Sequence, residues 1–395
     1  MQNTRDLYSH AEGVTKGLLT LKNRKDISDE NRKSILTFCQ STRANGISDS
    51  RCLQYLSILP AIAVSLRKDF KKATREDIER VLIEFEGNHA PQTMRTYRAI
   101  LKTFFKFLNG GEEYPPSVRW LHVKNGSNNN HRLPEELLTE AEILKLIEAC
   151  DHQRDKALIA LLYESGCRVG ELLTLQIKHV TFEDDLTKVI FQGKTGMRKV
   201  AVIDCTPHLA AWLSIHPDRK NPDAYIWTNI STHRRGAPLS YQALNKHIRR
   251  IAAKAGITKK VNPHSFRHAR ATVMANSLKE AQLKEYFGWT QGSDVAATYV
   301  HLSGRDIDDA VLQMHGRAPK NKAAISPLAP KRCPRCLNEN PSTGKFCSRC
   351  GLVLDQATAI ELQEKQDERD VMLSSIMEDK EVANLIREKI RQFEK

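Results

Sequence analysis

The sequence predicts a mainly α protein (α+β) of several domains with one small antiparallel β-sheet. Apolar residues recur at steps of three and four through most of the chain, which is the spacing of amphipathic helices. Runs rich in β-forming residues are confined to one segment, 179–203. A chain of 395 residues is long enough for two or three domains, each with its own core.

Changes in composition divide the chain into six parts. A proline pair and an asparagine-rich run predict a first linker, and a lysine- and proline-rich segment predicts a second. The predicted parts are 1–110 (helical domain), 111–132 (linker), 133–315 (second domain, helical with the β segment), 316–331 (linker), 332–354 (cysteine-rich module) and 355–395 (one charged helix).

The first domain is predicted to hold four or five helices and no strand. Thr74 and Asp77 have the spacing of a capping box, and Pro91 suits the first turn of the last helix. Basic residues at helical spacing line one side of that helix, and they fit either a solvated face or contact with DNA phosphates. They are Arg95, Arg98, Lys102 and Lys106.

The second domain alternates helices with three short β runs. Thr139 and Glu142 predict a capped helix, and Gly166 ends a later one. The β runs are 179–183, 188–191 and 199–203, and further helices are predicted from 206 and from 240.

The formal net charge is +14 and the pI about 9.3, which predicts a polyanionic partner, most simply nucleic acid. The most basic stretch lies at 246–260 and is predicted to contact DNA, with a solvated basic face as the alternative. Its residues are Lys246, Arg249, Arg250, Lys254, Lys259 and Lys260. No apolar run is long enough to span a membrane, and the N-terminus lacks a signal-peptide core, so a cytoplasmic location is predicted.

Chemistry-bearing residues gather in the second domain. Pro263 predicts a helix start, after which His264 and Arg267 share one face and suit a phosphate. Tyr299, further on, is a candidate nucleophile. Upstream, Arg168 follows a glycine turn and Lys194 lies in a glycine-rich turn between two β runs.

In this order and spacing, these motifs resemble the tyrosine recombinase (phage integrase) family over roughly residues 133–313. The matching positions are Arg168 and Glu171 (Gly-x-Arg-x-x-Glu-Leu), Lys194 (the hairpin lysine), His264, Arg267 and His268 (His-x-x-Arg-His) and Tyr299 (the nucleophile). Trp289 departs from the pattern, since most members have a histidine there. An indole N–H donates a hydrogen bond but does not shuttle protons.

The resemblance implies a site-specific recombinase that forms a 3′-phosphotyrosyl link through Tyr299, without metal or nucleotide cofactor. It implies that Arg168 and Arg267 hold the phosphate, that His264 is the base for the attack or supports that step, and that Lys194 protonates the leaving oxygen. In this scheme Glu171, one turn after Arg168, and His268 support their neighbours.

The resemblance also implies double-stranded DNA as partner. The first domain would clamp the DNA, and a tetramer would form on two DNA sites from monomers or dimers off DNA. A C-terminal element, here the predicted helix 307–314, would dock on a neighbouring subunit. Two alternatives stay open: a type IB topoisomerase-like nicking and rejoining enzyme, and a catalytically silent DNA-binding architectural protein.

Two Cys-x-x-Cys motifs ten residues apart predict a zinc ribbon with a closed, structural Zn²⁺ site. The ligands are Cys333, Cys336, Cys347 and Cys350. Two disulfides are the alternative, which a cytoplasmic location disfavours. Phe346 is predicted to fill the small core, and the module could bind DNA or protein. Its basic residues favour nucleic acid: Lys331, Arg332, Arg335, Lys345 and Arg349.

Overall fold

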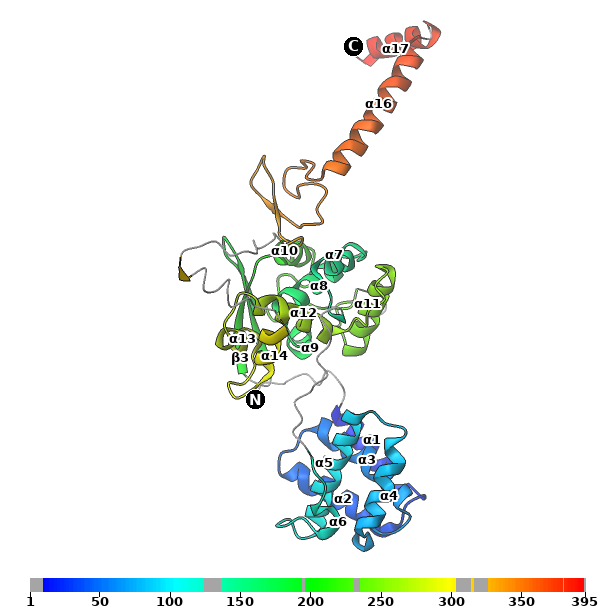
Figure 1. Cartoon of the computed structure of the whole chain (residues 1–395). Coiled ribbons are helices and arrows are strands. Elements are labelled where there is room, and N and C mark those ends of the chain that lie inside the picture. Colours follow the sequence, from blue (N-terminus) through cyan, green and yellow to red (C-terminus); the bar gives the residue numbers. More distant parts are fainter. Residues whose placement is uncertain are drawn as a thin grey trace. The chain divides into compact units, whose positions relative to one another are not determined.

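The computed structural model describes residues 10–123, 136–193, 196–230, 235–302, 314–315, 326–378 and 380–393. It divides into two compact units, 1–130 and 131–395, which are described separately (Figure 1). Within the described ranges, no helix combines the length and the apolar character that crossing a membrane requires.

The first unit is helical throughout its described part. Its elements are α1 (His10–Lys22), α2 (Asp29–Ala44), α3 (Asp49–Leu66), the 3₁₀ turn η1 (Phe70–Lys72), α4 (Arg75–Glu86), α5 (Pro91–Leu108) and α6 (Pro116–Arg119). The predicted capping box of Thr74 and Asp77 is present, with reciprocal side-chain and backbone hydrogen bonds. Pro91 occupies the first turn of α5, where the missing N–H costs no hydrogen bond.

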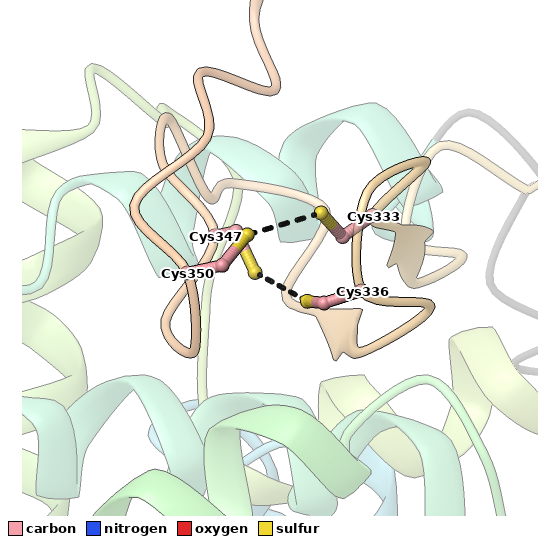
Figure 2. Close-up of side chains that lie close together, drawn as sticks. All are labelled: Cys333, Cys336, Cys347 and Cys350. Carbon is pink, nitrogen blue, oxygen red and sulfur yellow. Dashed lines mark hydrogen bonds between the residues drawn. The ribbon is translucent and has the colours of Figure 1, made fainter.

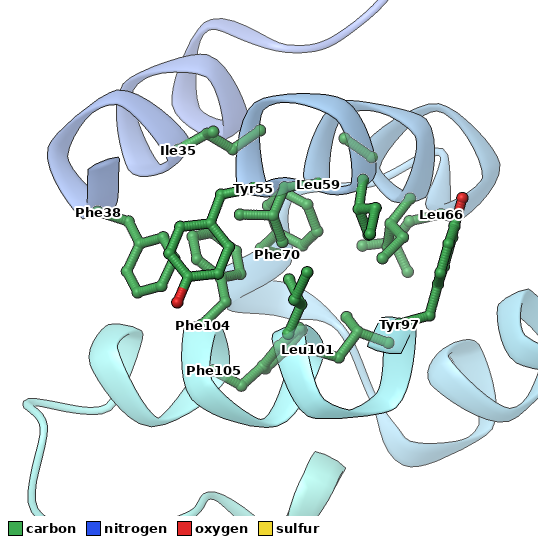
Figure 3. Close-up of a cluster of buried hydrophobic side chains, with 14 of the residues drawn as sticks. Ile35, Phe38, Tyr55, Leu59, Leu66, Phe70, Tyr97, Leu101, Phe104 and Phe105 are labelled. Atoms are coloured by element: carbon green, nitrogen blue, oxygen red, sulfur yellow. The ribbon is translucent and has the colours of Figure 1, made fainter. Parts of the chain in front are cut away.

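Aromatic side chains fill the core of this unit (Figure 3). The ring centroid of Phe38 lies 4.8 Å from Tyr55 and 5.2 Å from Phe104, and Phe70 lies 4.9 Å from Phe104. All four side chains are at most 2% exposed. Such ring contacts add about 0.5–1.5 kcal/mol each to the free energy gained by burial, so α2, α3 and α5 form one rigid body.

The predicted linker 111–132 is wrong in its first part. The short helix α6 lies there, and Val118 and Leu121 are buried in the core of the first unit. Lys102 donates a hydrogen bond to the Leu121 carbonyl at 2.9 Å, which secures the segment to α5. The proline pair that indicated an extended chain instead begins a helical turn, because Pro116 suits its first position.

The second unit carries the site. Its helices are α7 (Glu140–Glu148), α8 (Gln153–Ser165), α9 (Val169–Leu173), α10 (Thr206–Ser214), α11 (Tyr241–Lys254), α12 (Pro263–Ala275), α13 (Glu280–Phe287) and α14 (Val295–Leu302), with a 3₁₀ turn η3 (Ile177–His179). The strands β1 (Val180–Phe182), β2 (Thr187–Gly193) and β3 (Gly196–Val202) form the predicted antiparallel sheet in that order.

The end of α8 fixes the framework of the site. Glu164 is buried and accepts hydrogen bonds from the backbone N–H groups of Ile203, Asp204 and Cys205 at 2.5–3.0 Å, which joins the end of β3 to α8. Gly166 then turns the chain with φ of 53°, and a Cβ atom there would lie 2.4 Å from the Phe287 ring. Glycine is therefore required at the position that leads into Arg168.

The C-terminal part holds β4 (Lys331–Arg332), β5 (Glu339–Asn340), α16 (Gln356–Glu378) and α17 (Lys380–Phe393). The segment predicted as one charged helix, 355–395, contains the two described helices α16 and α17, and residue 379 between them lies outside the described residues. Exposed apolar residues of α17 lie on one face, at Val382, Leu385 and Ile386, whereas those of α16 do not share a face. The two segments therefore lack a common apolar stripe. The predicted helix 307–314 lies almost wholly outside the described residues.

Candidate active site and cysteine cluster

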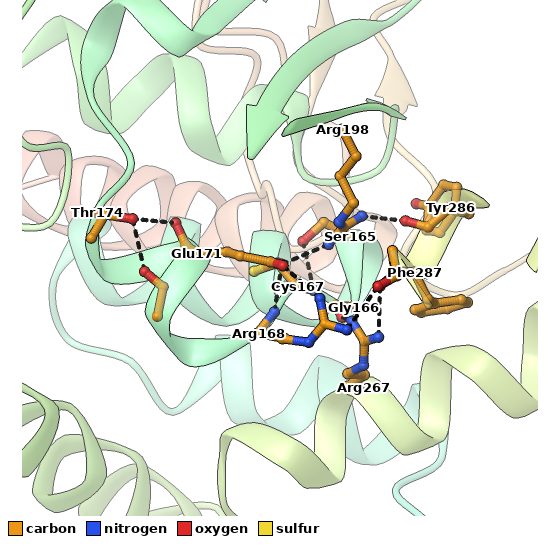
Figure 4. Close-up of polar contacts among 12 residues, drawn as sticks. Ser165, Gly166, Cys167, Arg168, Glu171, Thr174, Arg198, Arg267, Tyr286 and Phe287 are labelled. Atoms are coloured by element: carbon orange, nitrogen blue, oxygen red, sulfur yellow. Dashed lines mark hydrogen bonds and ion pairs between the residues drawn. The ribbon is translucent and has the colours of Figure 1, made fainter. Parts of the chain in front are cut away.

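Two arginines from distant parts of the chain meet at the end of α13 (Figure 4). Arg267 in α12 is 3% exposed and donates hydrogen bonds to the carbonyls of Gly166 at 2.7 Å and Phe287 at 2.6 Å. Arg168, the N-cap of α9, donates to the carbonyl of Gly288 at 2.8 Å. The two guanidiniums therefore bind adjacent carbonyls and converge on one place.

A buried carboxylate holds this cluster together. Glu171 is 4% exposed and contacts Arg168 at 2.9 Å and Arg198 at 2.8 Å. Burial alone would raise the pKa of Glu171, but the charge of Arg198 and hydrogen bonds from both arginines hold it below its usual value. A Cβ atom at Gly193 would lie 2.6 Å from the Glu171 carboxylate, so the β2–β3 hairpin packs directly on this ion pair.

Arg198 belongs to the site although sequence reasoning did not select it. It lies in β3, is 9% exposed, and also donates to the carbonyl of Tyr286. Val200 and Val202 alternate with exposed residues on the same strand and are buried. Alternate residues of a strand face the same side, so Arg198 faces inward with Val200 and Val202. This alternation in the sequence could have indicated that Arg198 is an inward-facing cation.

The cluster carries more positive than negative charge. Three guanidiniums surround one carboxylate, and the pKa of Arg267 falls to about 10 because of burial first and then the charges of Arg168 and Arg198. A bound anion would offset this repulsion and replace the backbone carbonyls as acceptor. The arrangement is thus suited to a phosphate group.

Tyr299 in α14 lies against this cluster and is 5% exposed. Its hydroxyl is hydrogen-bonded to Nδ1 of His268, and its ring stacks on Trp289 with a centroid distance of 5.4 Å and an interplanar angle of 4°. Trp289 also stacks on Phe287 at 4.9 Å, and the Arg267 guanidinium lies 5.3 Å from the Trp289 ring. The phenol and one phosphate-binding arginine therefore share an aromatic neighbour.

The two histidines of α12 lie at different distances from Tyr299 than their implied roles suggest. His268, expected to be a support, contacts the Tyr299 hydroxyl, whereas His264 is exposed and lies edge-on to His268 at 4.2 Å. They are four residues apart on one helix face, so both point the same way. The position of α14 decides which one meets the phenol, and it meets His268.

Residues 136–305 match the phage integrase family. This match, over the residues that form the cluster, decides the family. The domain at residues 136–305 belongs to the phage integrase family of tyrosine recombinases.

Individual proteins resemble this recombinase over different shares of its length. Tyrosine recombinase XerC of Chlamydia muridarum is 27% identical over 269 residues, which is 62% of this chain and 81% of that protein. Transposase A from transposon Tn554 of Staphylococcus aureus is 26% identical over 52% of this chain and 57% of that protein. A lambda integrase tetramer bound to a Holliday junction has the same fold, with a TM-score of 0.52 and 19% identity over 70% of this chain and 82% of that one.

The residues predicted to contact DNA differ in their surroundings, and their role stays a prediction. Lys246, Arg249 and Arg250 are exposed on α11, while Lys254 pairs with Asp151. In the first unit Arg98 pairs with Glu86, Lys102 lies 4.7 Å from the Tyr114 ring, and Arg95 is half-buried. Lys194, the predicted acid, lies outside the described residues.

Four cysteines of this recombinase form a separate cluster (Figure 2). Their sulfur atoms lie within 4.8 Å of one another, with 3.6 Å between Cys333 and Cys350 and 3.5 Å between Cys336 and Cys347. Four thiolates about 2.3 Å from one Zn²⁺ ion would be about 3.8 Å apart, whereas a disulfide needs about 2.05 Å. The cluster therefore fits a tetrahedral metal ion and excludes the two-disulfide alternative in this structure.

A buried asparagine, rather than the predicted Phe346, fills the interior beside the cysteines. Phe346 is 48% exposed, so that prediction is wrong. Asn340 is fully buried, donates to the Cys347 sulfur at 3.7 Å, and accepts from the backbone N–H of Ser348 at 2.9 Å. A polar side chain is favoured there because the sulfur and the backbone of the knuckle need hydrogen-bond partners.

Proposed function

We propose that this recombinase cuts and rejoins double-stranded DNA at specific sites through a 3′-phosphotyrosyl bond to Tyr299. One observation carries the proposal: Arg168 and Arg267 converge on adjacent carbonyls, beside the tryptophan on which the Tyr299 ring stacks. Bidentate arginines are suited to the two non-bridging oxygens of one phosphodiester. A phenol held beside them is placed to attack the phosphorus.

The chemical step then follows from the positions of these groups. The Arg168 and Arg267 guanidiniums exchange their carbonyl acceptors for the phosphate oxygens and stabilise the charge that develops during attack. The Tyr299 oxygen forms a bond to phosphorus while the bond to the 5′ oxygen breaks. His268 takes the phenolic proton, and Lys194 gives a proton to the departing 5′ oxygen.

A proton acceptor is needed because a phenol in water ionises only near pH 10, so at neutral pH it is a weak nucleophile. The product keeps one phosphoester bond for each one broken. A second 5′ hydroxyl can therefore reverse the step on a different strand without ATP or a metal ion.

The oligomer is proposed from a relative. Lambda integrase binds a Holliday junction as a tetramer, and we propose the same tetramer on two DNA sites for this chain. The first unit would serve as the DNA clamp, since a helical domain on a linker suits a protein that closes around a duplex. The exposed residues Lys246, Arg249 and Arg250 of α11 are the proposed contacts of the second unit.

The cysteine cluster is proposed to hold one structural Zn²⁺ ion. All four positions of a tetrahedral site are occupied by cysteines, so the metal would fold the ribbon and take no part in catalysis. The strand transfer step needs no other cofactor.

A covalent trapping assay tests the proposal. The full chain is incubated with a nicked duplex that carries its recombination site, so that the cleaved fragment diffuses away and the adduct accumulates. We expect a protein–DNA adduct on a denaturing gel with the native chain and none with Tyr299→Phe. An adduct that survives this substitution would refute the mechanism, and supercoil relaxation without recombinants would point to the topoisomerase-like activity.

A further inference from the structure

The cysteine-rich ribbon, residues 326–354, carries two kinds of basic residue. It has five cations and a single carboxylate, Glu339. Lys331 and Lys345 lie near Asp355, the residue that precedes α16. The pKa of the Asp355 carboxyl is lowered by hydrogen bonds from Thr358 and then by the charges of these two lysines. Both lysines therefore lie near one carboxylate of the same chain.

The three arginines of the ribbon, Arg332, Arg335 and Arg349, are exposed. Within the described residues, neither these arginines nor the two lysines form an ion pair. Each arginine adjoins a cysteine of the cluster in sequence, and Arg335 and Arg349 hold the same place in the two Cys-x-Arg-Cys knuckles. Because the sulfurs of Cys333 and Cys350 are 3.6 Å apart, the two knuckles meet at the metal site.

One alternative role for these arginines would be to offset the negative charge of a metal ion bound by four thiolates. Four thiolates with one divalent ion carry a net charge of about −2, which nearby cations stabilise. Three exposed guanidiniums exceed that charge, and their exposure leaves their donors available for an outside partner. Leu337 and Phe346 are also exposed, at 59% and 48%, so the surface combines cations with apolar side chains.

We propose that the ribbon is an additional DNA-binding surface, which binds backbone phosphates outside the catalytic site through Arg332, Arg335 and Arg349. The inference rests on the proposed function in so far as the chain acts on DNA. Arginine forks bind phosphate oxygens through two parallel hydrogen bonds, and such contacts are independent of base sequence. The ribbon would thereby lengthen the DNA segment that each subunit holds.

The test compares two double substitutions that remove equal charge from the full chain: Arg335→Gln with Arg349→Gln, and Lys331→Gln with Lys345→Gln. Affinity for a random-sequence 60-base-pair duplex is measured by fluorescence anisotropy over a range of salt concentrations. Two lost phosphate contacts should reduce the slope of log K against log salt by about 1.8. For the arginine pair we expect this reduction in slope together with about tenfold weaker binding. For the lysine pair we expect less than half of that reduction in slope.

Metal analysis and a charge-retaining variant separate binding from folding. Arg335→Lys with Arg349→Lys should keep one zinc per chain and most of the salt slope. An unchanged slope in the glutamine variant, or equal losses in the two glutamine variants, would overturn the proposal. A lost oligomer on size exclusion with unchanged DNA affinity would also overturn it, in favour of a protein partner. Binding to random DNA does not require strand cleavage, so absence of a covalent adduct would refute the proposed function separately.

Discussion

The hydroxyl of Tyr299 is hydrogen-bonded to Nδ1 of His268, although the two residues are 31 positions apart and come from different helices. The phenol is 5% exposed and stacked on Trp289, so its position is fixed before any DNA binds. The first group that a departing phenolic proton meets is therefore an imidazole, which can accept it.

Substitution of the two histidines should separate their roles. We expect His268→Ala to slow formation of the covalent adduct about 100-fold, the usual loss when a general base is removed. His264→Ala should slow it less than about tenfold, because His264 is exposed and lies edge-on to His268, whose Nδ1 is the atom bonded to the phenol. Single-turnover rates on the nicked duplex measure both. A larger loss for His264→Ala would restore the assignment that the family resemblance implied.

Glu171→Gln should weaken both the fold and the chemistry. The carboxylate is the counter-ion of Arg168 and of Arg198, which is itself 9% exposed. Leaving a buried charge without its partner costs about 3 kcal/mol or more of unfolding free energy. Urea denaturation measures this loss, and the trapping assay should show slower adduct formation.

The control for that experiment is Glu113→Gln, which breaks an exposed ion pair with Arg119. An exposed pair contributes less than about 1 kcal/mol, so this variant should unfold almost like the native chain. Equal losses in the two variants would mean that the buried ion pair does not organise the site.

The features of this protein that could be predicted well from the sequence depend on local chemistry or on family motifs. The capping boxes at Thr74 and Thr139 formed as expected, because caps need only residues three apart. The three strands were placed within a few residues of their bounds. Arg168, Arg267 and Tyr299 were predicted from their motifs and spacing; the structure places them around the end of α13 and Trp289, and their catalytic roles stay predictions.

The parts that sequence missed depend on tertiary packing. Arg198 is part of the site because β3 lies against Glu171. The alternation along β3 indicates that Arg198 faces inward, but it does not show that Glu171 is its partner. Whether His264 or His268 meets the phenol is decided by where α14 packs on α12. Likewise, α6 is held to the first unit by buried Val118 and Leu121, contacts that a proline-rich segment does not reveal.

Stability should depend on pH through Asp204. Burial, and then the charge of Glu164, raise the pKa of this carboxyl to about 6, above about 3.9 in an unfolded chain. The folded state therefore binds the proton of Asp204 more tightly than the unfolded chain does. This binding stabilises the folded state below pH 4, and the stabilisation is lost as the pH rises through 6. Asp204→Asn avoids this loss.

Above pH 7 we accordingly expect Asp204→Asn to be about 1–2 kcal/mol more stable than the native chain, a value reduced by the solvent that reaches this half-buried group. The difference should shrink towards pH 4. Chemical denaturation at several pH values measures it, with Asp184→Asn, on an exposed turn, as control. A difference independent of pH would show that Asp204 does not titrate in this range.

Asn340→Ala should loosen the metal site without removing a ligand. Its amide donates to the Cys347 sulfur and accepts from the Ser348 backbone, so its loss leaves both groups without a buried partner. Loss of such an outer contact typically weakens metal affinity about 10–100-fold. Competition with a zinc-binding dye measures this, and Ser348→Ala, which keeps the contact to sulfur, should change affinity much less. Equal zinc affinity in Asn340→Ala and the native chain would contradict the role given to Asn340.

Substitution of Trp289 distinguishes its hydrogen-bonding N–H from its flat surface. The ring lies parallel to Tyr299 at 5.4 Å, contacts Phe287 at 4.9 Å, and lies under the Arg267 guanidinium at 5.3 Å. These contacts favour a packing role. Trp289→Phe should therefore keep adduct formation within about tenfold of the native rate, because aromatic stacking persists without the indole N–H.

Trp289→Ala, by contrast, should slow adduct formation about 100-fold, since a phenol no longer held in place loses the rate gained from fixed orientation. Urea denaturation checks that both variants are folded under the assay conditions. If Trp289→Phe were as slow as Trp289→Ala while both stayed folded, the indole N–H would be the essential group. Trp289 would then bind the phosphate directly through that N–H.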